Sequence, residues 1–104
     1  MPTIRKTDVF KKWMKNLKDV MAKAHIDRRI DWLSRGNPGD AEPIGEGCSE
    51  MRISYGPGYR VYYKDTGREI CIILCGGDKS TQQRDIEKAK RLAREDEEED
   101  HENK

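Results

Sequence analysis

The sequence predicts an α+β fold in which two N-terminal helices pack on a small antiparallel sheet and a C-terminal helix follows. Three observations support this class. Apolar residues recur at helical spacing over residues 7–36, alternate with polar residues over 47–75, and return to helical spacing after residue 78. A chain of 104 residues buries one modest core, so a single domain is expected.

The N-terminal part carries two helix signals. Residues 1–6 are too few to show a pattern, and we interpret them as an extended segment that can add an edge strand. Thr7 or Asp8 is a suitable N-cap, and Asp19 is another. The apolar residues after the first cap share helical spacing: Val9, Phe10, Trp13, Met14 and Leu17. We therefore predict two helices, or one bent at residues 18–19, which end at the Gly-Asn-Pro-Gly sequence of 36–39.

A three-stranded meander over residues 48–76 is the central prediction. Residues 36–47 contain four glycines and two prolines, so we interpret them as a connector without a strand. The Gly-Pro-Gly sequence at 56–58 predicts a three-residue hairpin loop. This loop sets Tyr55 opposite Tyr59 and Ile53 opposite Val61 on the face that we assign to the core.

The second hairpin is predicted to turn at Thr66-Gly67 and to lead into a strand over residues 69–75. We place Ile70, Ile72 and Leu74 on the core face and Cys71 and Ile73 on the opposite face. The opposite face also receives four polar side chains of the first hairpin: Arg52, Arg60, Tyr62 and Lys64. Arginines beside tyrosines suit phosphate contact and base stacking, although a solvated polar face is the simpler interpretation.

After the meander, the Gly-Gly pair at 76–77 predicts a sharp turn into a helix, with Ser80 and Gln83 at capping-box spacing. The helix has only a thin apolar stripe, too weak for a central core helix. Residues 1–94 hold 20 basic and 13 acidic side chains, whereas residues 95–104 hold one and seven. We expect a single domain over 1–94 and an acidic, disordered tail over 95–104, or else a tail that shields the basic face. The basic body favours an anionic partner such as nucleic acid.

The cysteines do not form a disulfide framework. Cys71 and Cys75 lie four apart on one strand, roughly 13 Å from each other, which exceeds disulfide reach. No segment resembles a signal peptide or a membrane span, so we expect a cytoplasmic protein with no membrane partner. The cysteine spacing does not match a zinc site, and we predict no metal and no cofactor.

Four separated motifs carry a resemblance to a known family. They are Gly-Asn-Pro-Gly-Asp at 36–40, Gly-Glu-Gly-Cys-Ser-Glu-Met-Arg at 45–52, Gly-Pro-Gly-Tyr-Arg-Val-Tyr-Tyr at 56–63 and Leu-Cys-Gly-Gly-Asp-Lys-Ser-Thr-Gln at 74–82. Together they resemble the RelE/HigB-like toxins, also called addiction module killer proteins or the phage Gp49-like family, within the RelE/ParE superfamily. The resemblance covers about residues 8–94.

The resemblance implies a toxin of a type II toxin–antitoxin system that cleaves mRNA on the ribosome as an endoribonuclease (mRNA interferase). In such nucleases the RNA 2′-hydroxyl attacks the adjacent phosphate. The resemblance implies catalytic roles for Arg60 and Lys79. It also implies that Arg52 clamps a phosphate. From their places on the polar sheet face and after the last strand, we further predict that Tyr62, Lys64 and Gln82 bind RNA. A base-stacking tyrosine found in some members has no match here, where Gln82, Gln83 and Ile86 stand.

Two functions therefore remain open at this point. In the first, the chain inhibits translation by cleaving mRNA on the ribosome and is neutralised by a cognate helix-turn-helix antitoxin. In the second, it is a non-catalytic binding protein, either a gyrase inhibitor or a decayed toxin that retains antitoxin binding. Fold alone does not choose between them.

Overall fold

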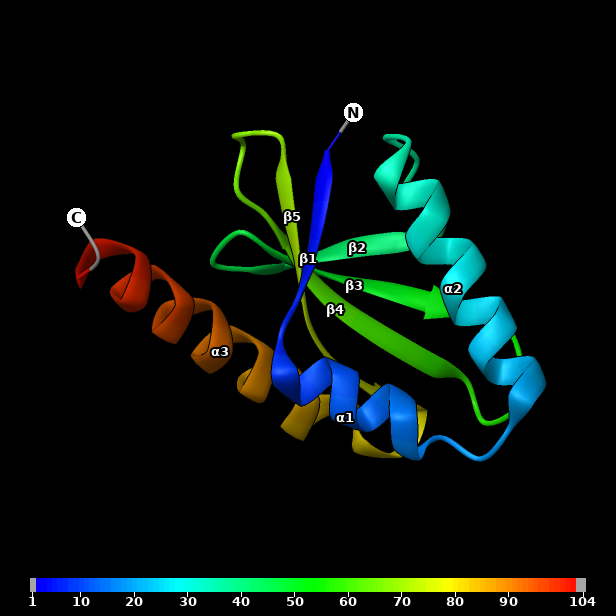
Figure 1. Ribbon diagram of the computed structural model, residues 1–104. Coiled ribbons are helices and arrows are strands. Elements are labelled where there is room, and N and C mark those ends of the chain that lie inside the picture. The colour runs from blue at the N-terminus through cyan, green and yellow to red at the C-terminus, as the bar shows by residue number, and fades with distance from the viewer. Residues whose placement is uncertain (1, 103–104) are drawn as a thin grey trace.

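The computed structural model describes residues 2–102 and has a five-stranded sheet with helices on both faces (Figure 1). In chain order the elements are β1 (Thr3–Lys6), α1 (Asp8–Asn16), α2 (Val20–Ser34), β2 (Ala41–Gly45), β3 (Cys48–Ile53), β4 (Tyr59–Asp65), β5 (Ile70–Asp78), a 3₁₀ turn (Lys79–Thr81) and α3 (Gln82–Glu102). The strand order is β1-β5-β4-β3-β2. The predicted α+β class is confirmed, and β1 adds a parallel strand beside β5.

The two N-terminal helices begin where the sequence predicts. The Thr7 hydroxyl accepts a hydrogen bond from the Phe10 amide at 3.0 Å and caps α1. The Asp19 carboxylate accepts from the Met21 and Ala22 amides at 3.0 and 3.1 Å and caps α2. Because each helix has its own cap, the chain forms two helices and not one bent helix.

The interpretation of residues 36–47 as a connector without a strand was wrong, because residues 41–45 form β2 at the edge of the sheet. Pro43 is compatible with this position, since an edge strand leaves one side without ladder hydrogen bonds. Gly45 and Gly47 have φ values of 101° and 78°, which allow the tight turn from β2 into β3.

The first hairpin has a five-residue loop over residues 54–58, so the predicted register was wrong by two positions. Ile53 lies opposite Tyr59, and Met51 lies opposite Val61. Inside the loop the Gly58 amide donates to the Tyr55 carbonyl, which closes a turn before β4 begins. A shift of two residues keeps every side chain on its predicted face of the sheet.

From Cys71 to Leu74 the faces of β5 are the reverse of those predicted, whereas Cys75 lies beside Tyr62, as its predicted face requires. A two-residue turn at Thr66-Gly67 would place Asp65 opposite residue 68. The loop over residues 66–69 instead places Asp65 opposite Cys71, three positions later. An odd shift inverts the strand. Cys71 and Ile73 therefore join the core cluster under α2, and a bulge at the Tyr62/Tyr63 step changes the register again.

The predicted sharp turn at residues 76–77 was also wrong, because β5 continues through both glycines to Asp78. A β-carbon on Gly76 would lie 2.5 Å from the Trp13 ring, and one on Gly77 would lie 1.9 Å from Asp85 Oδ2. The glycines therefore let α1 and α3 approach the strand from opposite faces.

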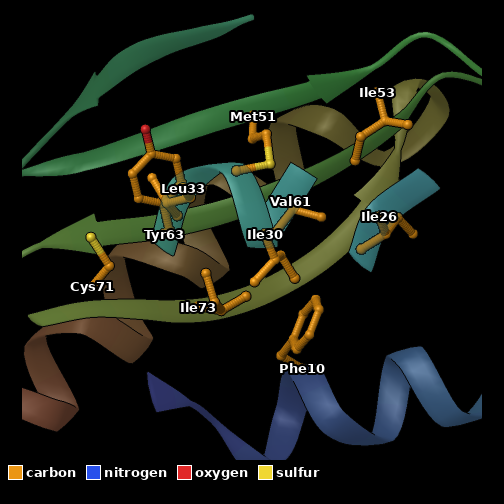
Figure 2. Packing of buried hydrophobic residues seen from close by; sticks show 10 residues of the cluster. All are labelled: Phe10, Ile26, Ile30, Leu33, Met51, Ile53, Val61, Tyr63, Cys71 and Ile73. Carbon is orange, nitrogen blue, oxygen red and sulfur yellow. The ribbon is translucent and has the colours of Figure 1, made fainter. Parts of the chain in front are cut away.

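Two apolar clusters fill the two faces of the sheet. The first joins Phe10 of α1 to Ile26, Ile30 and Leu33 of α2 and to the strands, as Figure 2 shows. The second lies under α3 and consists of a short set of buried residues: Cys48, Tyr62, Ile72, Leu74, Cys75, Ala89 and Ala93. The small alanines let α3 pack directly on the sheet, so this helix contributes to the core despite its thin stripe.

α3 continues to Glu102, so residues 95–102, which we expected to be disordered, are helical. Asp96 forms an ion pair with Arg5 at 2.8 Å, and Glu97 forms one with Lys64. These contacts agree with the alternative in which the acidic residues shield basic side chains. The division into a domain over 1–94 and a tail stays a prediction, and residues 103 and 104 lie outside the described chain.

Candidate functional site

Arg60, Glu50 and Gln82 form a polar cluster between the sheet and the start of α3. Arg60 Nη1 forms an ion pair with Glu50 Oε1. Gln82 Nε2 donates to both oxygens of the same carboxylate, at 2.9 and 3.0 Å. Only 13% of the Arg60 side chain and 4% of the Glu50 side chain are exposed. Glu50 therefore accepts hydrogen bonds from side chains of β4 and α3, and these bonds hold both elements to β3.

Lys79 lies at the same end of the sheet but faces solvent. It opens the 3₁₀ turn that follows β5. Asp78 holds this turn by accepting hydrogen bonds from the Ser80 amide at 2.8 Å and the Ser80 hydroxyl at 2.5 Å. These bonds hold the pKa of Asp78 below its usual range. Within residues 2–102, Lys79 has no ion pair and no side-chain hydrogen bond, so its ammonium group is available to a ligand.

The backbone brings these predicted catalytic residues together. Arg60 pairs with Gly77, two positions before Lys79. A β-carbon built on Gly58, in the β3–β4 loop, would lie 3.5 Å from Lys79 Cβ, so this loop contacts the turn. Arg60 points under α3, and Lys79 precedes Gln82, the first residue of that helix, by three positions.

Arg52 lies opposite Arg60 in the ladder, but its charge is already neutralised. Its Nη2 atom lies 2.8 Å from Asp40 Oδ1 and 3.2 Å from Glu42 Oε1. Hydrogen bonds to these two carboxylates raise the pKa of Arg52, and the same bonds hold the pKa values of Asp40 and Glu42 below their usual range. The sequence did not indicate that both carboxylates would lie beside this arginine.

Two of the predicted RNA-binding residues lie under α3. Tyr62 is completely buried, and its hydroxyl has no hydrogen-bond partner within residues 2–102. Burial, together with the carboxylates of Glu50 and Asp85, raises the pKa of Tyr62, so the phenol stays neutral. Tyr62 cannot stack on a base while α3 is in place, and this part of the prediction was wrong. Lys64 is paired with Glu97 of α3.

Sequence reasoning missed Glu50 and Asp85 as members of the site. Asp85 is buried and accepts a hydrogen bond from the Thr81 hydroxyl at 2.5 Å, beside Gly77. Alternation along β3 puts Glu50 on the same face as Arg52, but only the folded structure shows that Glu50 pairs with Arg60. A lone acid in the first turn of a helix gives no signal that distinguishes Asp85 from an ordinary solvated residue.

The described residues hold no group of three or more His, Cys, Asp or Glu side chains placed to bind a metal ion. Cys48, Cys71 and Cys75 are buried and unpaired. Burial raises the pKa of Cys75 to about 12. Among the helices of the described chain, none is long and apolar enough to cross a membrane.

Comparisons with known proteins show what the chain is similar to in sequence and in structure. No protein-family model matches the chain. An uncharacterized protein of Haemophilus influenzae is 49% identical over 92 residues, which cover 88% of this chain and 93% of that protein. A chain in the crystal structure of the intact E. coli RelBE toxin-antitoxin complex is similar with a TM-score of 0.61. The match covers 75% of this chain and 96% of that chain at 12% identity, and it establishes a RelE-like fold.

Proposed function

This chain belongs to the family of the uncharacterized Haemophilus influenzae protein, and we propose that it is the toxin of a toxin–antitoxin pair. One observation carries the proposal: the fold matches 96% of a chain in the RelBE toxin–antitoxin complex. Because fold alone does not determine function, the side chains at the end of the sheet supply the second support. The finer assignment to the RelE/HigB-like, phage Gp49-like toxins rests on the four sequence motifs.

We further propose that the chain inhibits translation by cleaving mRNA on the ribosome, in the cytoplasm. The RNA 2′-oxygen forms a bond to the adjacent phosphorus as the bond from phosphorus to the 5′-oxygen breaks. The proton of the 2′-hydroxyl leaves, and the 5′-oxygen gains one. Negative charge grows on the non-bridging oxygens, where cations fixed in advance stabilise the transition state by several kcal/mol.

Arg60 and Lys79 are the residues that we propose for this stabilisation. Arginine has five N–H donors, and Arg60 gives one to Glu50 while its Nε has no partner within the described residues. Lys79 is exposed and lies two residues after Gly77, the ladder partner of Arg60. Gln82, Arg52 and Lys64 would bind the neighbouring RNA backbone, the last two only after exchange of their carboxylate partners for phosphates.

A non-catalytic function, as a gyrase inhibitor or as a decayed toxin that only binds an antitoxin, is favoured by one specific observation. Arg52, Arg60 and Lys64 each form an ion pair with a carboxylate of the chain itself. A nuclease that binds RNA through these residues must break or share three such pairs, whereas a protein-binding function leaves them intact.

The test is primer extension on a defined mRNA in a reconstituted translation reaction, with and without ribosomes. We expect new RNA ends that require ribosomes and are lost with Lys79→Ala. This variant removes an exposed, unpaired side chain, so it should fold normally. Lys15→Ala, which changes an exposed lysine on α1, is the matched control and should cleave like the wild type. Continued translation without new ends would reject cleavage and favour the binding function.

A further inference from the structure

A hydrogen bond joins the 3₁₀ turn that carries Lys79 to the beginning of α3. The Thr81 hydroxyl donates to Asp85 Oδ2 at 2.5 Å. Asp85 is 5% exposed and Thr81 is half-buried, so this bond is largely protected from water. The Asp78 carboxylate also holds the turn, but its hydrogen bond to the Ser80 amide is exposed. The Thr81–Asp85 bond therefore ties the turn to the protein interior.

This bond packs against the strand position that pairs with Arg60. A β-carbon built on Gly77 would lie 1.9 Å from Asp85 Oδ2 and 3.1 Å from the Thr81 hydroxyl oxygen. Gly77 is the ladder partner of Arg60. The missing side chain of Gly77 therefore leaves the space that the carboxylate and the hydroxyl occupy. The pair contacts both the strand beside Arg60 and the turn that carries Lys79.

The position of the Lys79 ammonium group depends on this turn. Within the described chain its side chain has no ion pair and no hydrogen bond, so the backbone of residues 79–81 sets where the side chain begins. A 3₁₀ turn has poorer hydrogen-bond geometry than an α-helix, so its surroundings matter more. A misplacement of about 1 Å in an active site can lower a reaction rate about 100-fold. Support for the turn is thus support for charge stabilisation by Lys79.

Asp85 supplies this bond at a cost to stability. Burial of a carboxylate is unfavourable unless hydrogen bonds or a cation compensate it. Within residues 2–102 Asp85 forms no ion pair, and the Thr81 hydroxyl is the side-chain donor that reaches it. Its place in the first turn of α3 lessens the cost, because a helix N-terminus favours negative charge. An apolar side chain would fill the same space without this cost, so the directed bond to the turn is what the carboxylate adds.

We propose that Thr81 and Asp85 are positioning residues for Lys79, and that their hydrogen bond holds its ammonium group in register with Arg60 at the reacting phosphate. Neither residue needs to touch the RNA, because both act through the backbone of the turn. The inference rests on the proposed function, since it assigns a role in the same cleavage reaction.

The first experiment compares Thr81→Val, which removes the hydroxyl, with Thr81→Ser, which retains it. Single-turnover cleavage on preassembled ribosome–mRNA complexes, over a range of protein concentrations, gives the maximal rate and the half-saturating concentration. We expect Thr81→Val to lower the maximal rate at least about tenfold, because the lysine is no longer held in place. The half-saturating concentration should stay within about twofold of wild type, and Thr81→Ser should cleave within about threefold of it.

The matched control is Thr7→Val, which removes another part-buried threonine hydroxyl. The Thr7 hydroxyl donates to the Leu74 carbonyl at 2.6 Å and caps α1, away from the turn. Thermal unfolding measures the stability of both valine variants, and cleavage is compared at a temperature at which circular dichroism shows them folded. Thr7→Val should lose stability but cleave like the wild type. Equal loss of rate in the two variants would mean that stability alone is responsible, and would overturn the proposal.

A second experiment asks whether Thr81 acts through Lys79. Lys79→Ala/Thr81→Val should cleave no more slowly than Lys79→Ala, because the double variant has no lysine to position. In the free protein, hydrogen exchange of the amides at residues 79–82 should be faster in Thr81→Val and unchanged in Thr81→Ser. Additive losses of rate, or unchanged exchange in Thr81→Val, would overturn the proposal.

The two levels of inference fail in different ways. A wild-type protein that produces no new RNA ends rejects the proposed cleavage, and the positioning role with it. Cleavage by the wild type that Thr81→Val leaves unchanged rejects the positioning role alone.

Discussion

Arg60 of β4 and Glu50 of β3 are diagonal neighbours on the sheet, and they form an ion pair that α3 covers almost completely. Arg60 lies directly opposite Arg52 on the adjacent strand, and each arginine has its own carboxylate partner: Glu50 for Arg60, and Asp40 with Glu42 for Arg52. Glu50 thus joins three elements through Arg60 and Gln82. The position of the proposed catalytic arginine depends on a carboxylate that does not itself face solvent.

Glu50→Ala should destabilise the protein by about 3–5 kcal/mol, because it leaves the buried Arg60 guanidinium unpaired. Urea unfolding followed by circular dichroism measures this change. Glu42→Ala is the control, since it removes an exposed carboxylate from an arginine that retains Asp40 and should cost under about 1 kcal/mol. Equal costs for the two variants would contradict the structural role of Glu50.

Most of the fold could be predicted from periodicity and capping residues, because these are local properties of the chain. Thr7 and Asp19 cap the two N-terminal helices as expected, and the alternation in β3 and β4 gave the correct faces. The prediction of the faces of β5 was wrong because these faces depend on the length of one loop. A change of that length by an odd number of residues inverts the strand.

The site was less predictable than the fold, because its contacts join residues far apart in the sequence. Arg60, Lys79 and Gln82 do gather at one end of the sheet. The sequence indicated neither that α3 would bury Tyr62 nor that Asp40 and Glu42 would pair with Arg52. Gly76 and Gly77 are a further case, since they suggest a turn in the sequence but allow close helix packing in the fold.

Tyr62→Phe should leave the protein as stable as the wild type or stabilise it by about 1 kcal/mol. The reason is that the buried hydroxyl has no hydrogen-bond partner within residues 2–102, and an unsatisfied polar group destabilises the folded state. Thermal unfolding measures the difference. The matched control is Tyr55→Phe, whose hydroxyl lies 3.0 and 3.2 Å from the two Asp19 oxygens and whose loss should cost about 1 kcal/mol. A marked loss of stability in Tyr62→Phe would show that this hydroxyl has a partner.

The stability of the protein should fall in alkaline solution. Burial raises the pKa of the Cys75 thiol from 9.0 to about 12, so the folded state holds a proton that the unfolded state loses. This contribution is complete below pH 9.0 and is lost as the pH rises towards about 12, by at most about 1.4 kcal/mol per pH unit. Urea unfolding between pH 8 and pH 10.5, approximately the lower part of this range, should show a shallower decline for Cys75→Ala than for the wild type. Parallel declines would mean that Cys75 titrates alike in both states.

Glu97→Gln should increase affinity for single-stranded RNA at low salt by about two- to fivefold. Glu97 pairs with Lys64, one of the proposed RNA-binding residues, so its neutralisation frees an ammonium group at the sheet for phosphate. Fluorescence anisotropy with a labelled RNA oligomer measures the change, which should shrink as salt rises. Glu87→Gln removes the same charge from an exposed position on α3 and controls for net charge. If both variants gained affinity equally, the effect would come from net charge alone, and the acidic part of α3 would not mask Lys64.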